Sequence, residues 1–141
     1  MWDLRKRYIV DKNHAPPLVM INMKKGDKIV AELLDLFALE GYCVFVLESS
    51  TTKKDIRYIN LLSLFKDCQK SLSNTISFIQ HYSNADLFLI KSDEEYDNEL
   101  DNDKLVDLTI TDKSNKCANA ILVDEETEAA IIMEKALQIL L

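Results

Sequence analysis

Carboxylates are concentrated between residues 93 and 107, where eight Asp or Glu side chains accompany one lysine and the local net charge is −7. Alternating acids could ligate Ca²⁺, but an EF-hand loop requires Gly at its sixth position and Glu at its twelfth. Counted from Asp93, these positions hold Asn98 and Lys104, so a tuned calcium site is not expected. We call residues 93–107 the acidic segment.

Two apolar side chains stand within this charge and indicate a protein-binding surface. Tyr96 and Leu100 could supply affinity, while the surrounding carboxylates steer a basic partner and raise its association rate. The alternative is a solvated loop that binds nothing. The predicted partner-binding residues are Asp93, Glu94, Glu95, Tyr96, Asp97, Glu99, Leu100, Asp101 and Asp103.

A second candidate site lies where polar residues follow two expected strands. Glu48–Thr52 and Asp124–Glu126 both hold this position, and α/β proteins bind ligands outside the carboxyl ends of their strands. Each stretch also has a simpler interpretation. The hydroxyls of Ser49–Thr52 could cap the next helix, and Asp124–Glu126 could occupy the first turn of the final helix.

Histidine, cysteine and glycine form no recognisable catalytic or cofactor-binding pattern. His14 and His81 are isolated, and no two Cys or His residues have the spacing of a zinc site. Only two glycines are present, so neither a Walker loop nor a dinucleotide fingerprint can be written. The sequence therefore predicts no catalytic residue, no metal ligand and no cofactor. Cys43 and Cys68 lie in apolar runs, which is typical of buried thiols.

Composition narrows the class of protein. The 141 residues carry a net charge of −7, with 48% hydrophobic side chains and a pI near 4.8. This acidity argues against direct binding of nucleic acid. No run reaches the roughly 18 apolar residues of a membrane span, and no signal peptide is visible. We expect one globular domain over residues 1–141 in a reducing cytoplasm, because the three cysteines are odd in number and widely spaced.

The pattern of apolar residues predicts alternating strands and helices. Strands are expected at 8–10, 18–23, 42–47, 86–91, 106–111 and 118–123, and helices at 27–40, 53–70, 74–82 and 124–141. The unit formed by residues 18–47 is the clearest, with Gly41 as the left-handed residue that ends its helix. The fold class is α/β: a layered domain with a mixed, partly parallel sheet of about five or six strands and three or four helices. The acidic segment is expected to form the tip of an antiparallel hairpin.

Three functional hypotheses follow. The first is a small acidic protein that neutralises a basic partner, such as an immunity or inhibitor protein for a nuclease-type toxin. The alternative is a small α/β enzyme or ligand-binding regulator that uses Glu48–Thr52 and Asp124–Glu126. A third is a structural subunit that joins an assembly through its apolar C-terminal helix, which ends in Ile139, Leu140 and Leu141. The sequence leaves the oligomeric state open.

Overall fold

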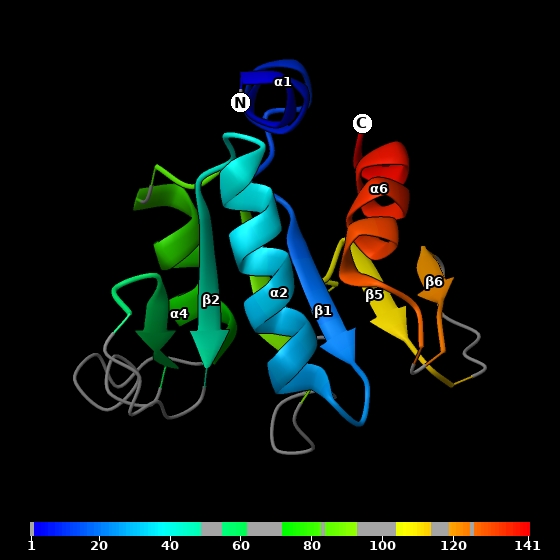
Figure 1. Ribbon diagram of the computed structural model, residues 1–141. Coiled ribbons are helices and arrows are strands. Elements are labelled where there is room, and N and C mark those ends of the chain that lie inside the picture. Colours follow the sequence, from blue (N-terminus) through cyan, green and yellow to red (C-terminus); the bar gives the residue numbers. More distant parts are fainter. Residues whose placement is uncertain are drawn as a thin grey trace.

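The computed structural model describes residues 2–48, 55–61, 72–82, 84–92, 104–113, 119–124 and 126–141. Its centre is a six-stranded sheet in the order β3-β2-β4-β1-β5-β6. Every paired strand runs parallel to its neighbour, and the arrows point the same way in Figure 1. The strands are β1 (Leu18–Asn22), β2 (Val44–Glu48), β3 (Tyr58–Asn60), β4 (Leu87–Lys91), β5 (Leu108–Thr111) and β6 (Ala120–Leu122).

The central strands are apolar on both faces, which is why their sequences show no polar alternation. In β1, Val19 and Ile21 belong to one hydrophobic cluster, whereas Leu18 and Met20 belong to the other. The same division separates Leu87 and Leu89 of β4 from Phe88 and Ile90. Two separate cores, one on each face, therefore hold the sheet.

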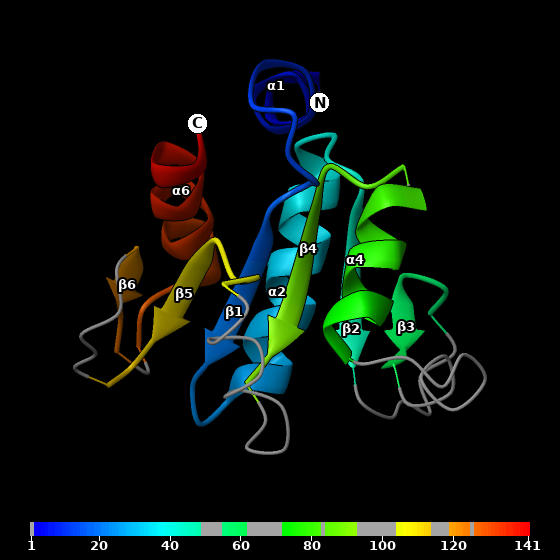
Figure 2. The same ribbon diagram turned by 180° about the vertical axis from the view of Figure 1, so that it is seen from behind.

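Helices cover both faces. On one face lie α2 (Gly26–Leu39) and α6 (Ala129–Leu140), which pack against each other. The other face carries α4 (Leu72–Tyr82), as the two opposite views show (Figures 1 and 2). Thus the expected α/β layered architecture of about six strands and four helices is confirmed.

Helix α2 follows the expected pattern closely. Its buried face is formed by apolar residues three or four positions apart, and Leu33 and Phe37 are almost completely inaccessible. The chain leaves the helix at Gly41, whose φ of 90° lies in the left-handed region that favours glycine. This connection returns the chain to β2, two positions from β1 in the sheet.

The sheet corrects the prediction of a mixed arrangement. β4 and β5 are both parallel to β1, which lies between them. β4 and β5 therefore cannot form the expected hairpin, because they are parallel and β1 separates them. The alternation of Leu108 and Ile110 with threonines is real, but alternation does not reveal strand direction.

Three element predictions were also wrong in their details. The N-terminal residues expected to include a strand at 8–10 form α1 (Trp2–Arg5) and a π-helical segment, η1 (Lys6–Asp11). Residues 58–60, expected within a helix, form the edge strand β3. The final helix begins at Ala129 rather than at Asp124. For the N-terminal segment tertiary packing overrode local propensity, because Leu4 and Tyr8 join the hydrophobic core.

No described helix is long and apolar enough to cross a membrane.

Candidate functional site

The strand order creates a switch point between β1 and β5. The connection after β1 leads towards β2 on one side of the sheet, whereas the connection after β5 leads to β6 on the other. Open α/β sheets bind ligands in the crevice where neighbouring connections diverge in this way, beyond the carboxyl ends of the strands. We call this end of the sheet the carboxyl edge.

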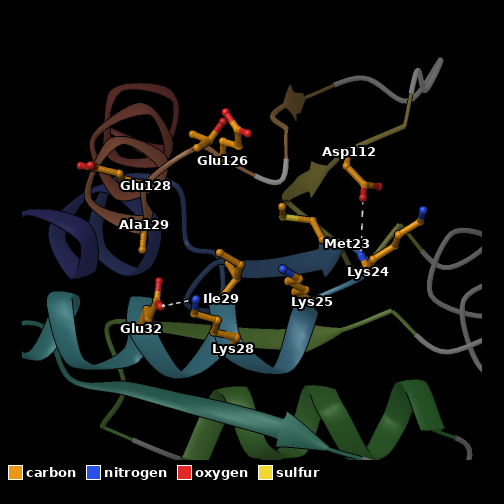
Figure 3. Close-up of a pocket in the computed structure, with 11 residues that line it drawn as sticks. Met23, Lys24, Lys25, Lys28, Ile29, Glu32, Asp112, Glu126, Glu128 and Ala129 are labelled. Carbon is orange, nitrogen blue, oxygen red and sulfur yellow. Dashed lines mark hydrogen bonds and ion pairs between the residues drawn. The ribbon is translucent and has the colours of Figure 1, made fainter.

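A pocket of about 280 Å³ lies at this switch point. Its walls come from the loop after β1, the first two turns of α2, the end of β5 and the segment that leads into α6 (Figure 3). The volume is close to the lower limit of about 300 Å³ for typical ligand pockets, so it suits a small metabolite. The lining residues are Met23, Lys24, Lys25, Lys28, Ile29, Glu32, Asp112, Glu126, Thr127, Glu128 and Ala129.

Lysines supply the basic side of the pocket. Lys25 is the residue before α2, and it lies near the middle of the close-up, between Met23 and Ile29 (Figure 3). Neither Lys24 nor Lys25 forms an ion pair within the described part of the chain. Lys28 has a weak one, in which its Nζ lies 3.8 Å from Glu32 Oε1 on the same helix. Such exposed i,i+4 pairs contribute only about 0.3–0.5 kcal/mol, so both Lys25 and Lys28 remain available to a ligand.

Asp112 faces these lysines from the residue after β5. Its Oδ2 lies 3.5 Å from the backbone nitrogen of Lys24, at the outer limit of a hydrogen bond. The other oxygen, Oδ1, is buried and has no hydrogen-bond partner among the described residues. Because Oδ1 is closed off from the cavity, a ligand in the pocket would meet Oδ2, whose long contact with Lys24 leaves it able to accept a further hydrogen bond.

A turn shapes the third wall of the pocket. Asp124 Oδ1 accepts hydrogen bonds from Thr127 Oγ1 and from the backbone nitrogen of Glu126, both at 2.9 Å. The bond from Thr127 is the main cause that lowers the pKa of Asp124, followed by the bond from Glu126. Asp124, Glu126 and Glu128 therefore precede α6, whose first turn contains no acid, and the Asp124 side chain closes the turn before it.

The predicted strand-end residues do not meet. Glu48 ends β2 and Asp124 follows β6, and three strands separate β2 from β6. Four strand spacings of about 4.8 Å place the two ends ~19 Å apart. Glu126 does line the pocket, whereas Ser49–Thr52 and Glu125 lie outside the described residues.

The acidic segment is described only from Lys104 to Asp107. All nine predicted partner-binding residues, from Asp93 to Asp103, lie outside the described residues. Just after them, Leu105 and Val106 pack against the cluster on the α4 face. The chain therefore reaches the start of β5 along that face.

Comparison of the chain with protein-family models, curated proteins and solved structures finds no match.

The histidines and the described cysteine lie away from this pocket. His14 is at the opposite, amino edge, where its Nε2 lies 3.7 Å from Asp107 Oδ1. His81 Nδ1 lies 2.7 Å from the carbonyl oxygen of Ser77 in α4. Cys43 is exposed rather than buried, which corrects the expectation for that thiol; Cys68 lies outside the described residues. Among the described side chains, no group of three or more His, Cys, Asp or Glu could hold a metal ion.

Sequence reasoning missed Lys24, Lys25, Lys28 and Asp112. A signal was present, because Lys24 and Lys25 directly follow an apolar strand and precede a helix. In a parallel unit that position is always at the carboxyl edge. Asp112 could not be placed beside them without the sheet order.

Proposed function

We propose that this protein is a small α/β ligand-binding domain, an enzyme or a ligand-binding regulator, whose site is the pocket at the β1/β5 switch point. The observation that carries the proposal is the coincidence of this pocket with a place where the connections of two adjacent strands diverge, from β1 towards β2 and from β5 towards β6. Parallel α/β sheets bind their ligands at such points because loops from several strands converge there on a rigid base.

The composition of the pocket supports a small polar ligand. Met23, Ile29 and Ala129 offer apolar contact, while the lysines and Asp112 offer charge. A few polar groups within an apolar lining fix the orientation of a ligand. We place this activity in the cytoplasm, following the cysteine content of the chain.

A thermal-shift screen with a pocket-filling variant tests the proposal. A ligand that binds only the folded protein raises its melting temperature, so a library of nucleotides, sugar phosphates, amino acids and organic acids should contain stabilising compounds. Lys25→Trp puts a large side chain at an exposed lining position near the middle of the pocket and should abolish the shift. The control Lys6→Trp makes the same change at an exposed position of η1 outside the pocket and should preserve it. Equal shifts in both variants would show that the compounds bind elsewhere.

A second proposal concerns the acidic segment, which could bind a basic protein in the manner of an immunity or inhibitor protein. Its support is the net charge of −7 within fifteen residues, with Tyr96 and Leu100 as apolar anchors.

Charge-neutralising variants test this second proposal. Wild type and a variant with Asp97→Asn, Glu99→Gln and Asp101→Asn are compared in a pull-down, and any protein lost from the variant is purified for kinetics. Its association with the variant should be slower and less dependent on salt. A control with Asp11→Asn, Glu40→Gln and Glu134→Gln changes the net charge equally at exposed positions. The idea fails if both triple variants bind alike.

A further inference from the structure

The pocket at the switch point places cationic side chains and a carboxylate around the same space. Lys25 and Lys28 approach from the loop after β1 and from α2, and Asp112 approaches from the end of β5. Lys24 extends away from the other lining side chains in Figure 3, as does Glu128. The groups best placed to contact a ligand are therefore Lys25, Lys28 and Asp112.

No ion pair joins the two sides of the pocket within the described chain. Lys25 has no carboxylate partner, Lys28 pairs with Glu32 on its own helix, and Asp112 contacts only a backbone nitrogen. The two lysines can therefore still bind an anionic group, and Asp112 can still bind a cationic group, within the same cavity. A ligand that carries both an anionic group and a donor can satisfy them together.

We propose that the ligand is a small amino-bearing oxyanion, with its phosphate or carboxylate on Lys25 and Lys28 and its ammonium donating to Asp112 Oδ2. This inference rests on the proposed function, because it assigns a ligand class to the same pocket. The ammonium contact is the selective one, because Asp112 Oδ2 has only a 3.5 Å contact with the Lys24 backbone nitrogen and an analogue without a donor lacks the charge-assisted hydrogen bond to it. The lysines fix the orientation of the ligand, and they attract any anion.

Two matched probe pairs separate the parts of this inference. 2-Aminoethyl phosphate is compared with ethyl phosphate, and β-alanine with propionate, so that each pair differs in the amino group and the two pairs differ in the oxyanion. Dissociation constants are measured on the full chain by NMR titration. The amino-bearing member of one pair should bind about tenfold more tightly than its analogue, the size expected for one hydrogen bond to a charged group. The pair that shows this preference identifies the oxyanion as phosphate or carboxylate.

Variants assign the preference to residues. Asp112→Asn should remove the preference for the amino group, and Lys25→Gln should weaken both members of the pair by a similar factor. Lys113→Gln is the control, because Lys113 is exposed and adjacent to Asp112 but does not line the pocket. Far-ultraviolet circular dichroism of each variant establishes that it is folded.

Three results would overturn the inference. They are equal binding of both members in both pairs, a preference that survives in Asp112→Asn, and no binding of any probe. In the last case the thermal-shift screen still decides the proposed function. A compound of another class whose stabilising shift is abolished by Lys25→Trp would leave the pocket as the site, with a different ligand.

Discussion

At the scale of single residues, two aspartates have the same structural role at the amino edge of the sheet, where the strands begin. Asp107 precedes β5, and its Oδ2 accepts a hydrogen bond from the backbone nitrogen of Leu18 at 2.8 Å. Asp86 precedes β4, and its Oδ2 accepts from the backbone nitrogen of Cys43 at 2.6 Å. Both carboxylates satisfy a backbone donor at or just before the start of another strand, where the sheet ladder does not yet provide an acceptor.

Asp107 should make stability depend on pH. Burial raises its pKa above the usual 3.8, against the opposing effects of the Leu18 nitrogen, His14 and Lys12. The folded state therefore binds this proton more tightly than the unfolded state, so the free energy of unfolding falls as pH rises through the interval between the two pKa values. Asp107→Asn removes this titration and can keep an acceptor for Leu18. Urea denaturation between about pH 4 and pH 6 should show Asp107→Asn gaining stability relative to wild type as pH rises.

A second variant separates the charge of Asp107 from its hydrogen bond. Asp107→Ala leaves the Leu18 nitrogen without its acceptor and should be less stable than Asp107→Asn by about 1–3 kcal/mol at every pH. Parallel pH curves for wild type and Asp107→Asn would contradict the raised pKa. No sequence pattern predicts this effect, because Asp107 was assigned to a charged segment and its partner is 89 positions away.

At the scale of elements, the N-terminal segment shows why local propensity misled the prediction. Tyr8, Ile9 and Val10 favour a strand by composition. However, Leu4 and Tyr8 are four residues apart, and both join the core on the face of α2 and α6. This spacing places both side chains on one face of a helical segment. Only the presence of a hydrophobic surface to cover could have favoured the helix.

Leu4 should therefore matter far more than its neighbours in sequence. It is completely buried, whereas Val10 is 58% exposed. Leu4→Ala should lower the free energy of unfolding by about 2–5 kcal/mol, and Val10→Ala should change it by less than about 0.5 kcal/mol. Equal effects of the two substitutions in chemical denaturation would mean that the N-terminal segment does not pack on the core.

The elements that could be predicted are those whose own residues determine their packing. β1, α2 and β2 follow from apolar runs and Gly41, and α4, β4 and β5 lie where the periodicity placed them. The start of α6 was misplaced because Asp124–Glu126 resembles the acidic first turn of a helix. In the structure the Asp124 side chain instead bonds Thr127 and closes a separate turn.

At the scale of the whole molecule, the order and direction of the strands could not be predicted from the sequence. Apolar strands covered on both faces predict a layered α/β fold, but Ile110 would be buried equally well in a parallel or an antiparallel β5. The parallel arrangement decides where function can reside. It brings the loop after β1, the end of β5 and the segment before α6 to one pocket, and it separates Glu48 from Asp124 by the width of the sheet.

The most direct test of the central claim is a residue-by-residue NMR map of ligand binding. The backbone amide spectrum of the full chain is recorded during titration with the stabilising compounds from the thermal-shift screen. We predict that the largest shifts fall on Lys24, Lys25, Asp112 and the residues around Glu126, with small changes at Glu48 and at the amino edge near Asp107. Shifts centred on Glu48, or scattered over the surface, would contradict the assignment of the site to the β1/β5 switch point.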